Sequence, residues 1–237
     1  MIARSEAPFQ HDDLPLPVEI RGVRGAKRMR LRLDEKRGIL KLTGPLRMNR
    51  KVALAWAVEQ RAWVDTQLGA MLPPEPFEAG ALIPIEGREV RLSWSADAPR
   101  TPRLEEDRLV CGGPAEGFAR RIERFLKRAA LDVLSKETAD AAQRAGVTLK
   151  AVSVGDADTR WGSCSSTGRI RYSWRLILAP ADVRRYVVAH EVAHLVHMNH
   201  GPKFKALEQE LFDGDARKAS LLLRRLGGRL RRLGRPR

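Results

Sequence analysis

Four of the chain's five histidines lie in the segment HEVAHLVHMNH, residues 190–200. Its first five residues follow the pattern HExxH. If this segment is helical, His190 and His194 are one turn apart on one face, so both imidazoles can reach one metal ion. Glu191 points about 100° around the helix from His190, which places its carboxylate beside the metal. The segment therefore predicts a metal site on a helix, with Glu191 as a general base and not as a ligand.

A second face of the same helix is apolar, as a helix that packs on a core requires. Its members are Val183, Val187, Val188, Val192, Leu195 and Val196. Neutral imidazoles in tetrahedral geometry suit Zn²⁺, and three protein ligands leave a fourth position open in a catalytic site. We therefore expect Zn²⁺ as the cofactor, with one ligand beyond the HExxH pair.

His200 is the leading candidate for the third ligand. His197 shares a helix face with His190 but lies about 10 Å further along a regular helix, too far for one ion. An asparagine and a glycine flank His200, and both tolerate a left-handed backbone that would end the helix and turn His200 toward the ion. The spacing also matches the metzincin pattern HExxHxxGxxH, with His197 in the place of the glycine. We expect metal ligands at His190, His194 and His200.

Other residues remain candidates for the third metal ligand. Cys164 would join HExxH as a cysteine does in peptide deformylases, although its WGSCSS context differs from the pattern of that family. Glu208 or Glu210, on the helix that follows, would make a gluzincin-type site. Donors to a tetrahedral oxyanion are open as well. The candidates are Tyr186, Tyr172, His197 and Arg160.

The patterning along the chain predicts an α+β protein with a β-rich N-terminal half. Residues 1–16 read as a disordered leader. Residues 17–113 contain short alternating strands, the first three in a meander, and one helix. Residues 114–216 begin with a long amphipathic helix and carry the histidine segment, and residues 217–237 form a basic tail.

Residues 170–178 alternate as a strand that would line the cleft. Apolar and aromatic residues fall on one face of this segment and arginine or serine on the other. As an edge strand it could pair with an extended substrate through backbone hydrogen bonds. Arg160, Trp161 and Ser163, in the preceding loop, could shape the same cleft.

The charge and the cysteine content of the chain restrict its possible partners and its cellular compartment. The net charge is +15, and residues 217–237 hold nine basic and no acidic residues, so this tail can bind nucleic acid or remain a solvated end. Two cysteines exclude a disulfide framework and favour a reducing compartment. With no signal peptide and no apolar run of about 18 residues, we expect a cytoplasmic protein without a membrane span.

The segments TRWGSCSSTGRI, RLILAP and YVVAHEVAHLVHMNHGPKF resemble the YgjP-like metal-dependent peptidases, a family of zincins. The NHGPKF end also resembles the distant SprT-like proteases, in which a His-Gly-Pro segment supplies the third zinc histidine. The resemblance implies a zincin-like α-β-β-α metallopeptidase core at 114–216. It also implies zinc ligands at His190, His194 and His200, with Glu191 as catalytic acid/base.

The sequence thus predicts a zinc-dependent metallopeptidase that hydrolyses peptide bonds of a polypeptide substrate. Two alternatives remain. The basic tail and the NHGPKF end would suit a nucleic-acid-associated protease of the SprT-like type. Cys164 as a ligand would instead suit a non-peptidase zinc amidase of the deformylase type.

Overall fold

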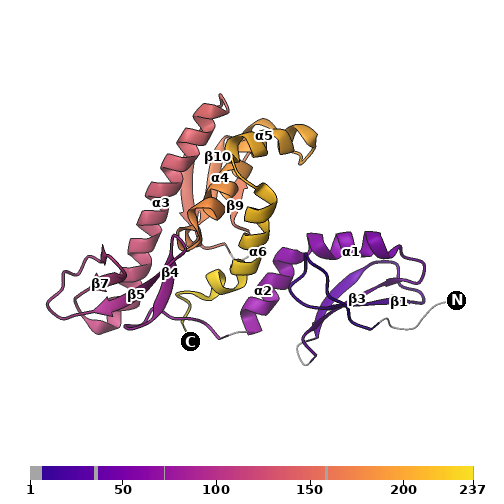
Figure 1. Cartoon of the computed structure of the whole chain (residues 1–237), viewed down its shortest axis with the longest axis horizontal. Coiled ribbons are helices and arrows are strands. Elements are labelled where there is room, and N and C mark those ends of the chain that lie inside the picture. Colours follow the sequence, from indigo (N-terminus) through magenta and orange to yellow (C-terminus); the bar gives the residue numbers. More distant parts are fainter. Residues whose placement is uncertain (1–6, 35–36, 72, 158–159, 237) are drawn as a thin grey trace. The chain divides into compact units, whose positions relative to one another are not determined.

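The structure is a computed structural model that describes residues 7–34, 37–71, 73–157 and 160–236. The chain divides into two compact units at 71/72. Among the described residues, no helix combines the length and apolar character needed to cross a membrane. The predicted α+β class is confirmed, because strands dominate the first half and helices the second (Figure 1).

The first unit is a small sheet covered by helices. Its sheet has the order β1-β3-β2, with β3 parallel to β1 and antiparallel to β2. The elements are β1 (Val18–Val23), β2 (Arg30–Asp34), β3 (Ile39–Pro45), α1 (Arg50–Glu59) and α2 (Arg61–Met71). Asn49 caps α1 by accepting from the amides of Lys51 and Val52. The predicted meander is wrong, because β1 pairs in parallel with β3 and not with β2, which leaves β3 with the fully buried Leu40 and Leu42 in the centre of the sheet.

The predicted disordered leader is partly wrong. Phe9 and Val18 exchange backbone hydrogen bonds of 3.1 and 2.8 Å, and Leu14 is buried in the core of the first unit. Residues 7–16 are therefore ordered by burial of their own apolar side chains. Residues 1–6 of the predicted leader lie outside the described residues.

The second unit begins with a sheet of order β4-β5-β7-β6. Its strands are β4 (Leu82–Ile85), β5 (Arg88–Trp94), β6 (Arg103–Glu105) and β7 (Arg108–Cys111). Buried residues of this sheet share one apolar core with the following helices, and the Glu86 amide donates to the carbonyl of Ile177 at 2.8 Å. The predicted segment 17–113 is therefore divided, and its part from 72 onward packs with the C-terminal half.

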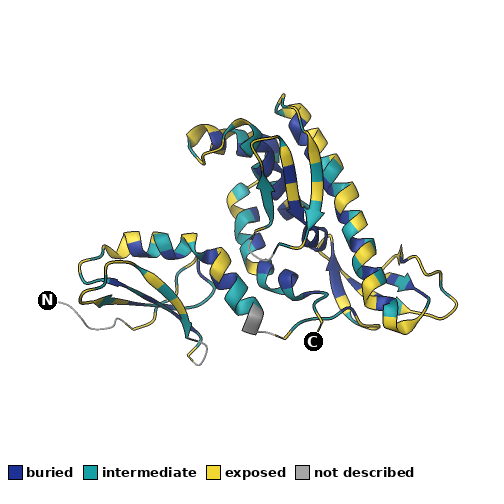
Figure 2. Ribbon diagram, turned by 180° about the vertical axis from the view of Figure 1, so that it is seen from behind, coloured by how far each residue is buried: buried dark blue, intermediate teal, exposed yellow. Residues whose placement is uncertain are grey.

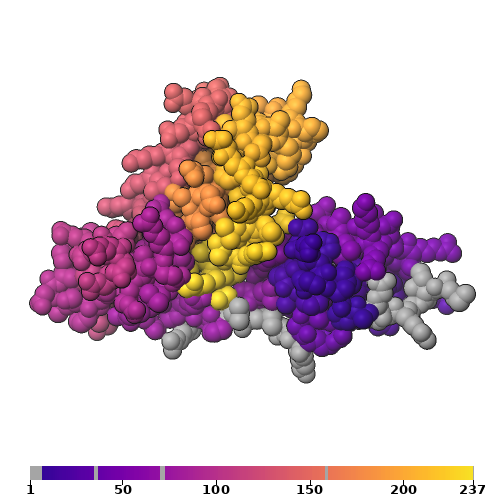
Figure 3. Space-filling view, viewed as in Figure 1, coloured from indigo at the N-terminus to yellow at the C-terminus, as the bar shows by residue number. Residues whose placement is uncertain are grey.

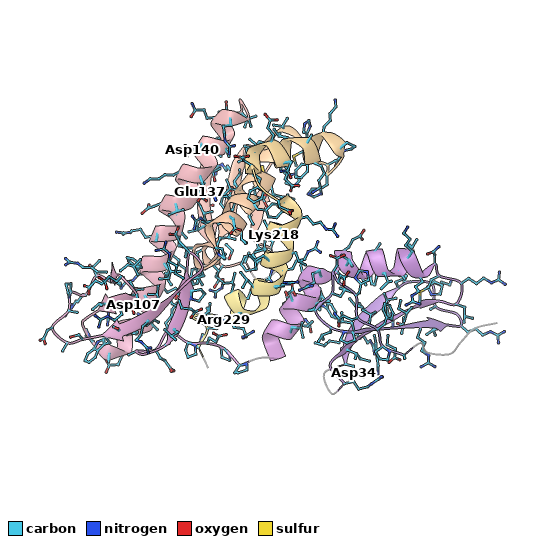
Figure 4. All side chains as sticks on the ribbon, viewed as in Figure 1. Asp34, Asp107, Glu137, Asp140, Lys218 and Arg229 are labelled. Carbon is cyan, nitrogen blue, oxygen red and sulfur yellow. The ribbon has the colours of Figure 1, made fainter. Side chains whose placement is uncertain are left out.

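The C-terminal part of this unit is a mixed sheet with helices on one face. The elements are η1 (Ala115–Gly117), α3 (Phe118–Arg144), β8 (Ala151–Gly155), β9 (Gly162–Cys164), β10 (Arg169–Ser173), η2 (Trp174–Leu178) and α4 (Ala181–Val196). The strand order is β8-β10-β9, with β10 parallel to β8 and antiparallel to β9. Exposed and buried residues alternate along β10 from Arg169 to Tyr172, whereas β8 and β9 contain no buried residue (Figure 2). Arg184 on α4 forms a 2.8 Å ion pair with Glu137 on α3, which is labelled in Figure 4.

The prediction for 170–178 needs correction. The strand β10 ends at Ser173, and residues 174–178 form the short 3-10 helix η2, in which every side chain is buried. A half-buried strand would expose Arg175, whereas its guanidinium lies buried 4.3 Å from the Trp174 ring. β10 is also the central strand, so the edge strand next to α4 is β9.

The basic tail is largely a packed helix. After α5 (Pro202–Phe212), the helix α6 (Ala216–Arg232) buries one apolar face in the core, and Figure 3 shows it (yellow) beside α5 on one face of the unit. Arg229, labelled in Figure 4, pairs with Glu75 and Glu89 at 3.1 Å each. These contacts give α6 a structural role that a solvated tail would not have.

Truncation of the α6 core face will therefore destabilise the second unit. Leu230 is 2% exposed, so Leu230→Ala should lower its free energy of unfolding by about 2–5 kcal/mol in urea denaturation. Arg225→Ala, on the exposed face of the same helix, is the matched control, with an expected change within about 0.5 kcal/mol. Equal stability of the two variants would contradict this role.

Candidate metal centre

The helix α4 carries the HExxH pattern and ends one residue before His197. His197 adopts an extended backbone conformation, and Pro202 starts α5 a few residues later. The predicted left-handed turn is wrong, because neither Asn199 nor Gly201 has a positive φ. The residue before a proline favours extended conformations, which explains Gly201. The resulting tight connection between α4 and α5 returns His200 to the histidine face of α4.

The structure brings the three predicted histidines together. Among the described residues, one ligand atom from each of His190, His194 and His200 lies within 4.8 Å of the others. The Nε2 atoms of His190 and His200 are 3.3 Å apart. Burial lowers the pKa values of His194 and His200, and the charge of His190 acts in the same direction. Neutral rings with converging nitrogens fit a divalent transition metal.

Hydrogen bonds behind the rings orient two of these histidines. The Nδ1 of His190 lies 2.6 Å from Oε1 of Glu208, and the Nδ1 of His194 lies 3.2 Å from the carbonyl oxygen of His197. Because each Nδ1 donates its proton to an oxygen, each Nε2 carries the lone pair that a metal needs. Glu208, open as a third ligand from the sequence, therefore stands behind His190 and is not in the metal-facing cluster.

Glu208 is a buried carboxylate held by two partners. Its side chain is 3% exposed, and Lys205 donates to its Oε2 at 2.8 Å. Burial acts to raise the pKa of Glu208, but the hydrogen bonds from His190 and Lys205 outweigh it and hold the pKa below its usual value. Glu208 thus stays ionised and strengthens the basicity of the His190 ring.

Phe204 forms an apolar floor below the three rings. Its ring centroid lies 5.1, 4.6 and 4.7 Å from those of His190, His194 and His200, and the residue is fully buried. Neither Phe204 nor this use of Glu208 was predicted from the sequence. Their signal is helical spacing, since the two residues lie four apart on α5 and so share one face.

Glu191 packs against the edge strand β9. A β-carbon at Gly162 would lie 2.6 Å from Cγ and 2.7 Å from Cδ of Glu191, so only glycine leaves room for this carboxyl group. Burial raises the pKa of Glu191 to about 7, although the charges of His190 and Arg160 act to lower it. A carboxyl group that titrates near neutrality can both accept and return a proton.

The remaining candidates lie outside the histidine cluster. Burial, with the charge of Glu191, raises the pKa of the Cys164 thiol to about 11, and its sulfur is not part of the cluster. Glu210 is exposed on α5. The Tyr172 side chain is buried, and its hydroxyl is hydrogen-bonded to Thr138 on α3, so the hydroxyl is not available as an oxyanion donor.

Tyr186 and His197 also take part in local contacts. The Tyr186 ring packs edge-on against Phe212 at 5.6 Å, with its centroid 6.3 Å from that of His190. His197 supplies its carbonyl to His194. Arg160 is exposed, and its charge acts on Glu191.

Comparison with known proteins identifies one matching protein family. A family model described as YgjP-like, metallopeptidase domain matches residues 27–225, which includes α4 and the three histidines. The comparisons with curated proteins and with solved structures returned no match.

Loss of the carboxylate behind His190 will weaken metal binding. Glu208→Ala should lower the affinity for Zn²⁺, used as the probe ion, by about 10–100-fold in competition with a chromophoric chelator. Glu210→Ala removes an exposed carboxylate from the same helix and should leave the affinity unchanged. Equal affinities would show that Glu208 does not support the metal centre.

Proposed function

The chain belongs to the YgjP-like metallopeptidase family, and we propose that it is a zinc-dependent peptidase that hydrolyses peptide bonds of polypeptides. His190, His194 and His200 hold the metal, and Glu191 is the general base. The observation that carries this proposal is the convergence of three imidazoles on the helix face next to the buried Glu191 carboxyl group.

The donor set favours Zn²⁺. Imidazole nitrogens suit zinc, and a site with three protein ligands leaves one position open, as catalytic zinc sites do. When bound, zinc supplies a Lewis acid that polarises a carbonyl and lowers the pKa of water toward about 7. The contacts of Glu208 and of the His197 carbonyl keep two Nε2 atoms available for that ion.

Glu191 moves the protons of the reaction. Its carboxylate takes a proton from the attacking water and then delivers it to the nitrogen of the leaving amine. A pKa near 7 suits both steps, since the group is partly ionised at neutral pH. Gly162 supports this role because its missing side chain lets the carboxyl group rest on the backbone of β9.

The edge strand β9 supports a polypeptide as the substrate. It pairs with β10 along one edge, and no described strand pairs with its other edge. An extended peptide can add to such an edge through main-chain hydrogen bonds, which depend little on sequence. The strand that contacts Glu191 would then also hold the chain to be cut.

The two alternatives have weaker support. A deformylase-type site would need Cys164 among the metal-facing atoms, and its sulfur lies outside that cluster. A nucleic-acid-associated protease would use the basic tail, and Arg229 and Arg232 of that segment are engaged with Glu75. Binding of nucleic acid stays a prediction from the sequence.

Removal of the Glu191 charge should abolish turnover without loss of metal. Glu191→Gln should lower kcat/KM for an unfolded protein such as reduced casein by about 10²–10⁴-fold, because the proton acceptor is lost. Glu210→Gln is the matched control, and metal content is measured for both. An active Glu191→Gln protein with full metal content would overturn the assignment.

A further inference from the structure

A small hollow lies on the sheet face that points away from α3 and α4. On β10, Tyr172 faces α3 through its bond to Thr138, so the neighbouring Arg171 faces the opposite side. Ser163 on β9 is the register partner of Arg171 and shares this outer face. The hollow has a volume of about 270 Å³, and Arg160 is one of its lining residues.

The hollow is rich in hydrogen-bond donors. Neither Arg160 nor Arg171 forms an ion pair with any residue that the structure describes. The guanidinium of Arg171 lies over Gly155. A β-carbon at Gly155 would come within 2.8 Å of the Arg171 Cζ atom, so only glycine leaves room for the guanidinium in this position. Two guanidinium groups that pair with no described carboxylate, both beside one hollow, favour an anionic ligand.

A buried hydroxyl is a second, independent observation that indicates a ligand site. Ser173, another lining residue, is 1% exposed, and its Oγ has no hydrogen-bond partner in the described part of the chain. Buried polar atoms without partners are rare in native proteins and call for a ligand or water. Asp156 also lines the hollow, and its carboxylate is engaged by Arg175 at 3.2 Å.

The hollow lies directly across β9 from the proposed catalytic group. Gly162 lines the hollow and also contacts the Glu191 carboxyl group, and the charge of Arg160 acts on Glu191. Side chains of an extended peptide added to β9 would point alternately to the inner and the outer face. A substrate residue next to the cleaved bond would therefore project toward Arg160 and Arg171.

We propose that this hollow is a substrate subsite that binds a carboxylate of the polypeptide, with Arg171 and Arg160 as specificity-determining residues. The carboxylate comes either from an aspartate or glutamate side chain or from the C-terminus of the substrate. The proposal rests on the peptidase function proposed above. The enzyme would then prefer to cut beside an acidic residue or near a chain end.

The test compares cleavage of peptide libraries by the metal-loaded wild type and four variants. One library has amidated C-termini and acidic or amide residues at each position; the other has free C-termini and only amide residues. We expect wild type to favour one carboxylate source by about tenfold or more in kcat/KM, the scale of one charge-assisted hydrogen bond, mainly through KM. The library that shows the preference identifies the source.

Arg171→Gln and Arg160→Gln should each reduce that preference to below about threefold, and Arg171→Lys should restore part of it. Arg169→Gln removes an exposed charge from the same face of β10 outside the hollow and should retain the full preference. Cleavage without a carboxylate preference, or with one that Arg171→Gln leaves intact, overturns the subsite alone. Absence of cleavage by wild type overturns the proposed function together with the subsite.

Discussion

Three imidazole rings can share one ion only if their free nitrogens face one another, and the contacts behind the rings set that orientation. Glu208 accepts from His190, the His197 carbonyl accepts from His194, and the Phe204 ring lies below the cluster. All of these contacts come from the connection between α4 and α5 or from α5 itself. The proposed metal centre therefore depends on the packing of α5 against α4, because a shift of α5 would move His200 and the support of His190 together.

The strand β9 links the proposed metal centre to the rest of the unit. Its first residue, Gly162, touches Glu191, and the preceding Trp161 accepts a backbone hydrogen bond from Ser173 at 2.8 Å. The Arg231 guanidinium of α6 lies 4.6 Å from the Trp161 ring. The helix α6, which the sequence predicted as a basic tail, thus stabilises the segment that leads into the edge strand β9. This arrangement explains the composition of α6. Its apolar residues form one face that joins the core, and Arg229, Arg231 and Arg232 contact neighbouring elements.

The sequence predicted the parts of the site that depend on local spacing. HExxH on an amphipathic helix predicted α4 with His190 and His194 on one face, and the resemblance to the YgjP-like family is confirmed by the family match. Contacts between segments that are distant in the sequence could not be predicted from local spacing. The use of Glu208 depends on how α5 packs, and β9 is a three-residue strand with a glycine, too short for an alternating pattern. The strand predicted at 170–178 failed because Arg175 is buried against an aromatic ring, which periodicity alone does not reveal.

X-ray absorption spectroscopy of the zinc-loaded protein tests the central claim most directly, because it reports the atoms bound to the ion. The account predicts a shell of nitrogen and oxygen atoms at about 2.0–2.1 Å, with the multiple-scattering pattern of three imidazoles. A sulfur atom at about 2.3 Å would instead place Cys164 on the metal. That result, or a protein that retains no zinc, would contradict a metal centre built from His190, His194 and His200.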